Sequence, residues 1–145
     1  MQNQYKVLRV IAGLVAAYHL LLGMLLNGPV NWITAVATHV LGATRMPDAS
    51  ALFLARMLGT YLIVFGIGMV LVVWNPVKNR VLLTLGAIVA ALRAVQRLAQ
   101  ADDLSQSLGI SCGGNWATIV MLLAIAAVLL FLRLQLHRNM ARDAR

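Results

Sequence analysis

The segment that most constrains the fold runs from Val81 to Gln100, where a long apolar stretch carries two arginines one helical turn apart. About 20 apolar residues in a helix span about 30 Å of hydrocarbon, so this segment is long enough to cross a bilayer. A charged side chain at the centre of such a span costs at least about 2.5–3.5 kcal/mol, and less near the interface. We therefore expect Arg93 and Arg97 to reach lipid headgroups or to face a polar interior.

Three other segments are similarly apolar. The four apolar segments are separated by polar, basic or glycine–proline stretches. Between the first two, apolar side chains recur at helical spacing and Trp32 suits headgroup depth, which is typical of a short helix in the interface. The sequence therefore predicts a single all-α domain over residues 1–145, an integral membrane four-helix bundle with a short interfacial helix between helices 1 and 2. The expected transmembrane helices cover about residues 5–26, 51–74, 81–100 and 116–133, and the interfacial helix about residues 30–41.

Composition excludes an ordinary soluble domain, because 61% of the residues are hydrophobic and only 11% are charged. A typical soluble domain has about 25% charged residues. In a soluble protein the net charge of +8 would suggest nucleic acid, but here we attribute it to orientation in the membrane and to anionic headgroups. We therefore expect membrane lipids, and no nucleic acid, among the partners. A single cysteine, Cys112, excludes an internal disulfide and a cysteine-based metal site.

The basic residues are distributed unevenly along the chain and predict its orientation. Eight of the twelve lie at the start of helix 1, in the turn at 75–80, or from residue 133 onward. Because lysine and arginine in short loops stay in the cytoplasm, both termini and this turn are expected there, with the basic tail 134–145 continuing the last helix into water. The segment after helix 1 and a polar loop at 101–115 would then face outside. We expect a multi-pass protein of the bacterial inner (cytoplasmic) membrane.

Helical rise places several polar side chains at defined depths. At about 1.5 Å per residue, Arg97 lies about 25 Å beyond Arg80 and near the outer interface, and Arg93 lies about 6 Å deeper. Arg56 is also expected near the outer interface, and His19 near the middle of the bilayer. These positions predict a basic pocket in the outer half of the bundle.

Small residues share a helical face with some of these polar residues. Such faces let neighbouring helices approach closely, so they are expected to face the interior of the bundle. The stripes consist of Ala12, Ala16, His19 and Gly23 in helix 1, Gly59 and Gly66 in helix 2, and Gly86, Ala90, Arg93 and Arg97 in helix 3.

Each arginine that we name as a candidate ligand-binding residue has a structural alternative. Arg56 and Arg97 could extend to lipid headgroups, and Arg97 could pair with Asp102 or Asp103. Arg93 lies deeper and is expected to meet an anionic partner inside the bundle, namely a lipid phosphate, a carboxylate ligand or an acid of another subunit.

His19, the fourth candidate, could be a neutral imidazole hydrogen-bonded to a neighbouring helix. Alternatively, it could coordinate haem or a chlorin pigment, or form a hydrogen bond with a quinone carbonyl. His39 and His137 lie outside the expected spans, so no second histidine is placed for a bis-histidine haem. The spans contain no paired carboxylates, Ser–His–Asp set or HExxH motif. Neither catalytic residues nor a metal site is therefore expected.

Four features of the sequence form a pattern. The predicted helices are four and short, and an outer segment follows the first of them. An arginine opens helix 2 in ARMLGTYLIVFGIGMVL, and an arginine pair lies late in helix 3 in ALRAVQRL. In outline over helices 1 to 3, this pattern resembles the DoxX-like small bacterial membrane proteins. Some members of that family are subunits of quinone-linked oxidoreductases. The resemblance implies that Arg56, Arg93 and His19 surround a quinone or a lipid headgroup.

We therefore predict a non-catalytic accessory or structural subunit of a larger respiratory or photosynthetic complex, which binds lipid, quinone or a pigment in the outer basic pocket. The first alternative is a DoxX-like subunit of a quinone-linked oxidoreductase. The second is a small transporter, although the interior has few polar residues to line a transport path. Other membrane subunits or a second copy of the chain are the expected protein partners, and the cofactor is left open between none, a quinone and a pigment held by His19.

Overall fold

The computed structural model describes residues 5–46 and 48–143, with side chains through residue 140. Its elements are α1 (Lys6–Leu26), α2 (Val30–Ala35), the π-helical turn η2 (Val36–Val40), α3 (Ala49–Trp74), α4 (Arg80–Ala99), α5 (Ala101–Leu108) and α6 (Cys112–Asp143). Four of them, α1, α3, α4 and α6, are long and apolar enough to cross a membrane. This confirms the prediction of an all-α chain with four such helices and a short helix between the first two.

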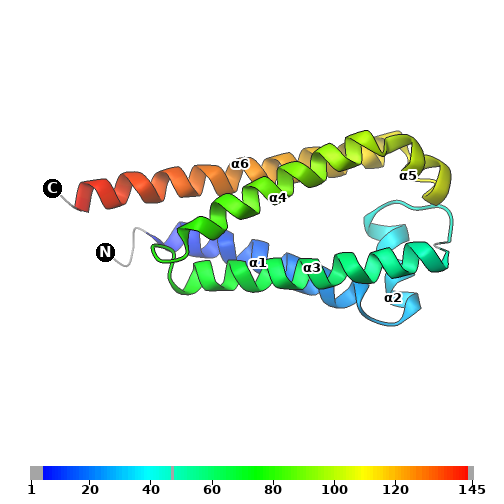
Figure 1. Cartoon of the computed structure of the whole chain (residues 1–145), viewed down its shortest axis with the longest axis horizontal. Coiled ribbons are helices and arrows are strands. Elements are labelled where there is room, and N and C mark those ends of the chain that lie inside the picture. Colours follow the sequence, from blue (N-terminus) through cyan, green and yellow to red (C-terminus); the bar gives the residue numbers. More distant parts are fainter. Residues whose placement is uncertain (1–4, 47, 144–145) are drawn as a thin grey trace.

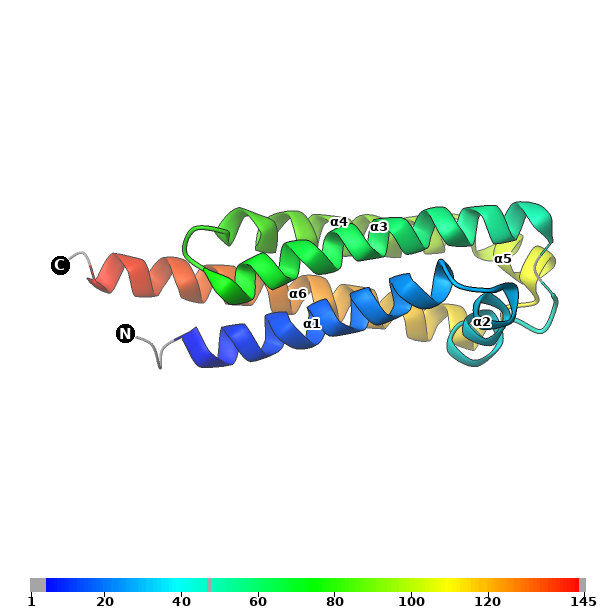
Figure 2. The ribbon, with the colours of Figure 1, turned by 90° about the horizontal axis from the view of Figure 1, so that it is seen from below.

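The four long helices form two antiparallel pairs (Figure 1). α1 packs along α3 and α4 packs along α6, and between the pairs α3 touches α4 much less extensively. The pairs lie close together at the end that holds both termini and the turn at 75–79, which we call the basic end. They diverge toward the end that holds α2, η2 and α5, which we call the capped end. Seen from below, α3 lies over α4 and α1 crosses α6 (Figure 2).

Glycines let α1 and α3 approach closely. A Cβ atom on Gly23 would lie 2.7 Å from the carbonyl oxygen of Gly59, and one on Gly66 would lie 2.7 Å from the Cγ atom of Leu20. The predicted stripes of small residues do face the interior, because their members are buried apart from the two half-buried arginines of α4.

A dry core fills the half of the bundle nearer the basic end and draws on all four long helices. Leu83 and Leu129, from the second pair, and Val72, from the first, are completely buried there. We call this cluster the apolar plug, and it consists of Leu8, Ala12, Ala16, Met69, Val72, Leu83, Ala87, Ala90, Ala126, Leu129, Leu132 and Leu136.

The short helix predicted between the first two long helices is present at the capped end, but it has two parts. α2 is a short α-helix, and the next five residues continue it as η2. Gly42 follows with φ +70°, a left-handed conformation that glycine adopts without strain. Asp48 then caps α3, its carboxylate accepting a hydrogen bond of 2.7 Å from the Ala51 amide.

The prediction of a polar loop at 101–115 was wrong, because α5 occupies most of the first half and α6 begins at Cys112. Two aspartates in the first turn of α5 suit the positive end of its dipole. Gly109, at φ +65°, ends the helix in the left-handed conformation. The apolar side of α5 joins a small cluster with the segment after α2, made of Ala37, Leu41, Ala43, Leu104, Leu108 and Ile110.

Hydrogen bonds connect the two helix pairs at the capped end, where the pairs are farthest apart. The amides of Thr44 and Arg45 donate to the carbonyl oxygen of Leu108 at 3.1 and 3.2 Å. The Thr44 hydroxyl donates to the Gly109 carbonyl at 3.1 Å, and the Arg45 guanidinium donates to the Gln106 carbonyl. The segment between α1 and α3 is thereby tied to the segment between α4 and α6.

Candidate functional site

Polar side chains from three helices lie at one level of the bundle. His19 follows the start of α1 by 13 residues, Arg93 follows the start of α4 by 13 residues, and Tyr61 precedes the end of α3 by 13 residues. At about 1.5 Å per residue, each lies about 20 Å from the basic end. His19 and Arg93 also lie one turn beyond Ala16 and Ala90, where the apolar plug ends. The sequence estimate had set His19 and Arg93 at different depths, whereas the helix starts bring them level.

His19 is a buried side chain, 5% exposed, held by its own helix and by α3. Its Nδ1 atom lies 2.7 Å from the carbonyl oxygen of Val15, and its ring centroid lies 4.5 Å from that of Phe65. A carbonyl only accepts, so the neutral ring carries its proton on Nδ1 and leaves Nε2 as an acceptor. No hydrogen bond among the described residues uses Nε2. The expected bond to a neighbouring helix is therefore replaced by one within α1.

A pocket of about 200 Å³ lies beside His19 between α1 and α6. Two of its rim residues, Leu14 and Tyr18, are exposed on the outer surface of the bundle, so the pocket is reached from the lipid-facing side. Its lining is apolar except for one imidazole and one phenol, and consists of Leu14, Val15, Tyr18, His19, Met121 and Ile125.

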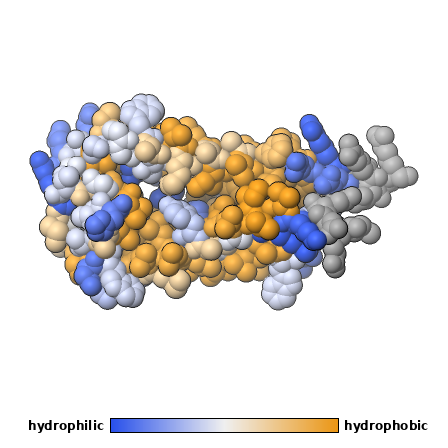
Figure 3. Space-filling model, turned by 180° about the vertical axis from the view of Figure 1, so that it is seen from behind, coloured by the Kyte–Doolittle hydropathy of each residue, from blue (hydrophilic) through white to orange (hydrophobic). Residues whose placement is uncertain are grey.

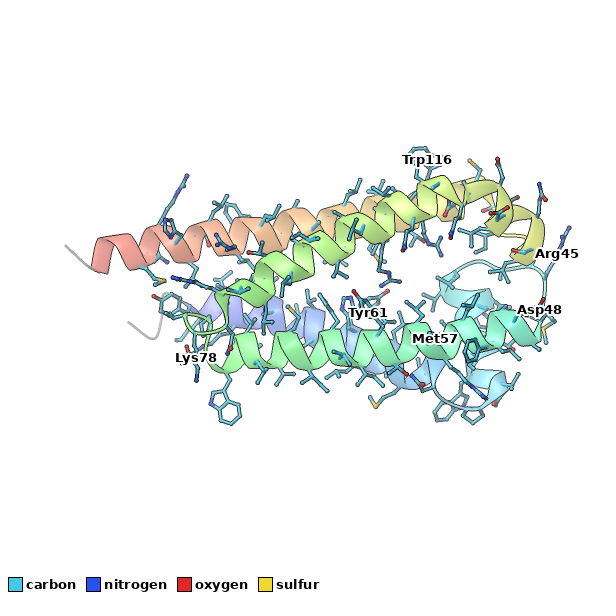
Figure 4. The ribbon with its side chains drawn as sticks, in the orientation of Figure 1. Arg45, Asp48, Met57, Tyr61, Lys78 and Trp116 are labelled. Carbon is cyan, nitrogen blue, oxygen red and sulfur yellow. The ribbon has the colours of Figure 1, made fainter. Side chains whose placement is uncertain are left out.

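Arg93, on α4, lies at the level of His19 and is not one of the residues that line this pocket. It is half-buried, and His19, Tyr18 and Tyr61 belong to the other helix pair. Tyr61 points from α3 toward the α4–α6 pair (Figure 4). No hydrogen bond from the Arg93 side chain is found among the described residues, so its five N–H donors are available to a ligand.

Arg97, one turn farther along α4, is held differently. Its Nη1 atom donates to Oδ1 of Asn115 at 2.9 Å, and Nδ2 of Asn115 donates back to the carbonyl oxygen of Arg97 at 3.3 Å. Asn115 is itself 6% exposed. The pairing with Asp102 or Asp103 that we expected is not formed, because both aspartates are exposed on α5 and the amide takes their place.

Arg56 is the one candidate that the structure does not bring into this group. Its side chain is exposed, and it lies about 140° around α3 from Tyr61 at about 100° per residue. His19, Arg93 and, through its neighbour, Arg97 therefore form the site, while Arg56 faces the surroundings of the bundle.

The space-filling surface is hollowed between the pairs, and hydrophilic residues lie within the hollow while orange apolar residues surround it (Figure 3). The site offers guanidinium and phenol donors, one imidazole acceptor and an apolar lining. Such a set can hold one amphipathic molecule with a carbonyl or anionic group. Among the described residues, no group of three or more histidine, cysteine or acidic side chains could hold a metal ion.

From the sequence we assigned no role to Tyr18, Tyr61 or Asn115. The available signal was the distance from helix ends, because Tyr61 and His19 are equally far from the basic end. Trp116, by contrast, points away from the site (Figure 4).

Scans of the chain against protein-family models, curated proteins and solved structures found no match.

Proposed function

We propose that this chain binds one lipid-soluble molecule with a polar head, a quinone or a lipid, at the level of His19 and Arg93. The observation that carries the proposal is the half-buried guanidinium of Arg93, which has no hydrogen-bond partner among the described residues, at the same level of the bundle as the imidazole of His19. A charge within a span costs at least about 2.5–3.5 kcal/mol unless it is near the interface or compensated. A ligand carbonyl, phosphate or carboxylate would compensate it.

The size of the pocket argues for a single ring or chain. Its volume of about 200 Å³ is below the roughly 300–1,000 Å³ typical of sites for drug-sized ligands. A quinone ring or an acyl chain fits this space better than a pigment macrocycle does. His19 would then be a hydrogen-bond acceptor, or a donor when protonated, and not an axial ligand.

The apolar plug argues for binding and against transport. A transported polar solute would need polar groups along its path, but beyond Ala16 and Ala90 the core is apolar and tightly closed. Within the described residues, no polar path therefore continues from the level of His19 and Arg93 through the plug to the basic end. The small transporter is the least supported of the three functions.

We place this binding chain in a larger complex of the bacterial inner membrane, as a non-catalytic accessory subunit with both termini in the cytoplasm. No acidic residue lies within the apolar part of the four spans to exchange protons with a quinone. If the occupant is a quinone, the partner would be a quinone-linked oxidoreductase, as the DoxX-like resemblance implies. Cys112, exposed at the capped end, should react with a membrane-impermeant thiol reagent added outside the cell, and labelling only after lysis would reverse the orientation.

The ligand proposal is tested by purifying the intact protein in mild detergent and measuring bound quinone and phospholipid per chain after extraction. Arg93→Gln should retain about tenfold less of the specific ligand, because a charge-assisted contact is lost. Arg56→Gln removes the same charge from an exposed face of α3 and should retain as much as wild type. Equal retention in both variants would overturn the proposal.

The mass and absorption spectrum of the same particle test whether the chain belongs to a larger complex and which class of molecule it binds. A large particle with defined partners supports the accessory subunit. A small particle with stoichiometric quinone supports independent quinone binding, and a pigment spectrum would exclude our choice of occupant.

A further inference from the structure

A second pocket lies at the basic end, far along the bundle from His19 and Arg93. Its volume is about 190 Å³, and it is lined by Arg80 from the start of α4 and by Arg133 and His137 from α6. His137 follows Arg133 by one helical turn, so the two side chains share a face. No carboxylate whose side chain the structure describes lines this pocket. Two helices thus bring two guanidiniums and an imidazole together.

The hydrogen-bonding capacity of these side chains is largely unused. The Nε atom of Arg133 is buried and has no hydrogen-bond partner among the residues that the structure describes. Within the described part of the chain, the Nη1 atom of Arg80 has only the sulfur of Met140 within range, at 3.6 Å, and a thioether is a weak acceptor. The buried Nε of Arg133 without a partner is costly, whereas Arg80 and His137 are exposed. Neighbouring guanidiniums also repel each other. An anion between them would remove both penalties.

The position of the pocket along the bundle indicates the kind of anion. Arg80 is the first residue of α4, and the apolar, exposed Val81 follows it. On α6, Leu132 and Leu136 of the apolar plug flank Arg133. The pocket therefore lies where the apolar girdle ends, at the depth of lipid headgroups. The N-terminus of α4 adds the positive end of a 20-residue helix dipole.

We propose that Arg80, Arg133 and His137 form a phosphate-binding site. Arginine forks bind phosphate oxygens through paired N–H donors, and basic pockets between helices at this level suit anionic headgroups. The phosphate belongs either to an anionic phospholipid or to a free phosphate. This site is independent of the ligand proposed for His19 and Arg93.

The test uses the full-length protein in detergent and the variant Arg133→Gln. Its matched control is Arg138→Gln, which removes the same charge from an exposed position on the same turns of α6. In the first arm, native mass spectrometry measures the fraction of protein that carries added phosphatidylglycerol, with phosphatidylcholine for comparison. In the second arm, the melting temperature is measured in inorganic phosphate and in chloride of equal ionic strength.

We expect Arg133→Gln to lower phosphatidylglycerol occupancy about tenfold relative to wild type and to Arg138→Gln. That result supports the site with a lipid as its source of phosphate. If instead inorganic phosphate raises the melting temperature of wild type and Arg138→Gln by about 2 °C or more, but not that of Arg133→Gln, the site is supported with free phosphate. Arg80→Gln should behave as Arg133→Gln does, which keeps the test valid if one variant folds poorly. Equal behaviour of Arg133→Gln, Arg80→Gln and Arg138→Gln in both arms overturns the proposal.

Discussion

The two halves of the bundle use the same four helices in opposite ways. Toward the basic end the pairs converge, and Leu83, Leu129 and Val72 belong to one fully buried apolar core. Toward the capped end the pairs diverge, and Arg93 and His19 occupy the level where the apolar plug stops. Ten residues of α4, about 15 Å at 1.5 Å per residue, separate Leu83 from Arg93.

This difference shows where along its helices a small membrane protein can accommodate charged side chains. Two arginines on a buried face would disrupt the converging half, because uncompensated charge there has neither water nor partners. In the diverging half, Arg97 has an amide partner, and Arg93 lies at the level of Tyr61 and His19. Divergence of the helices thus makes the polar site possible, and we expect the plug to supply most of the stability of the bundle.

The first prediction tests whether the plug carries the stability. Leu83→Ala should lower the free energy of unfolding by about 3 kcal/mol, because it leaves a cavity in a fully packed core. Leu85→Ala, two residues along α4 and half exposed, should cost less than about 1 kcal/mol. Unfolding in mixed micelles, followed by circular dichroism, measures both. Similar losses in the two variants would mean that the converging half is no better packed than the surface of the helix.

The second prediction concerns the glycine contact that fixes the first pair. Gly23→Ala should destabilise by about 2 kcal/mol, because the new Cβ would lie 2.7 Å from a backbone oxygen of Gly59. Gly13→Ala, in the same helix, would place its Cβ 3.8 Å from a Val73 methyl, so it should be neutral or stabilise by up to about 1 kcal/mol. The same unfolding assay compares them. A Gly23→Ala protein as stable as wild type would show that α1 and α3 can move apart without loss of stability. The glycine contact would then not fix the geometry of the first helix pair.

Much of this fold could be predicted from periodicity and hydropathy. The stripe through Ala12, Ala16, His19 and Gly23 indicated the buried face of α1, because small residues at helical spacing mark close helix contacts. Hydropathy also located the four long helices, since each apolar run exceeds the thickness of the hydrocarbon.

The remaining features depend on contacts between distant parts of the chain. α5 is polar and short, and it is stabilised by packing against Ala37 and Ala43, which no local pattern reveals. Arg97 and Asn115 are 18 residues apart and meet only because α4 and α6 pair. The placement of Arg93 and Tyr61 at one level of the bundle depends on the arrangement of the two pairs, which hydropathy does not determine.

The third prediction sharpens the comparison within the diverging half, where Arg97 has a protein partner and Arg93 has none among the described residues. In a double-mutant cycle, Arg97→Leu and Asn115→Leu should show a coupling energy of about 1 kcal/mol, because each removes the partner of the other. The matched cycle of Arg93→Leu with Asn115→Leu should show a coupling close to zero. Both cycles use the free energy of unfolding in mixed micelles. Equal coupling in the two cycles would place both arginines in one structural network, and Arg93 would then have no donors left for a ligand.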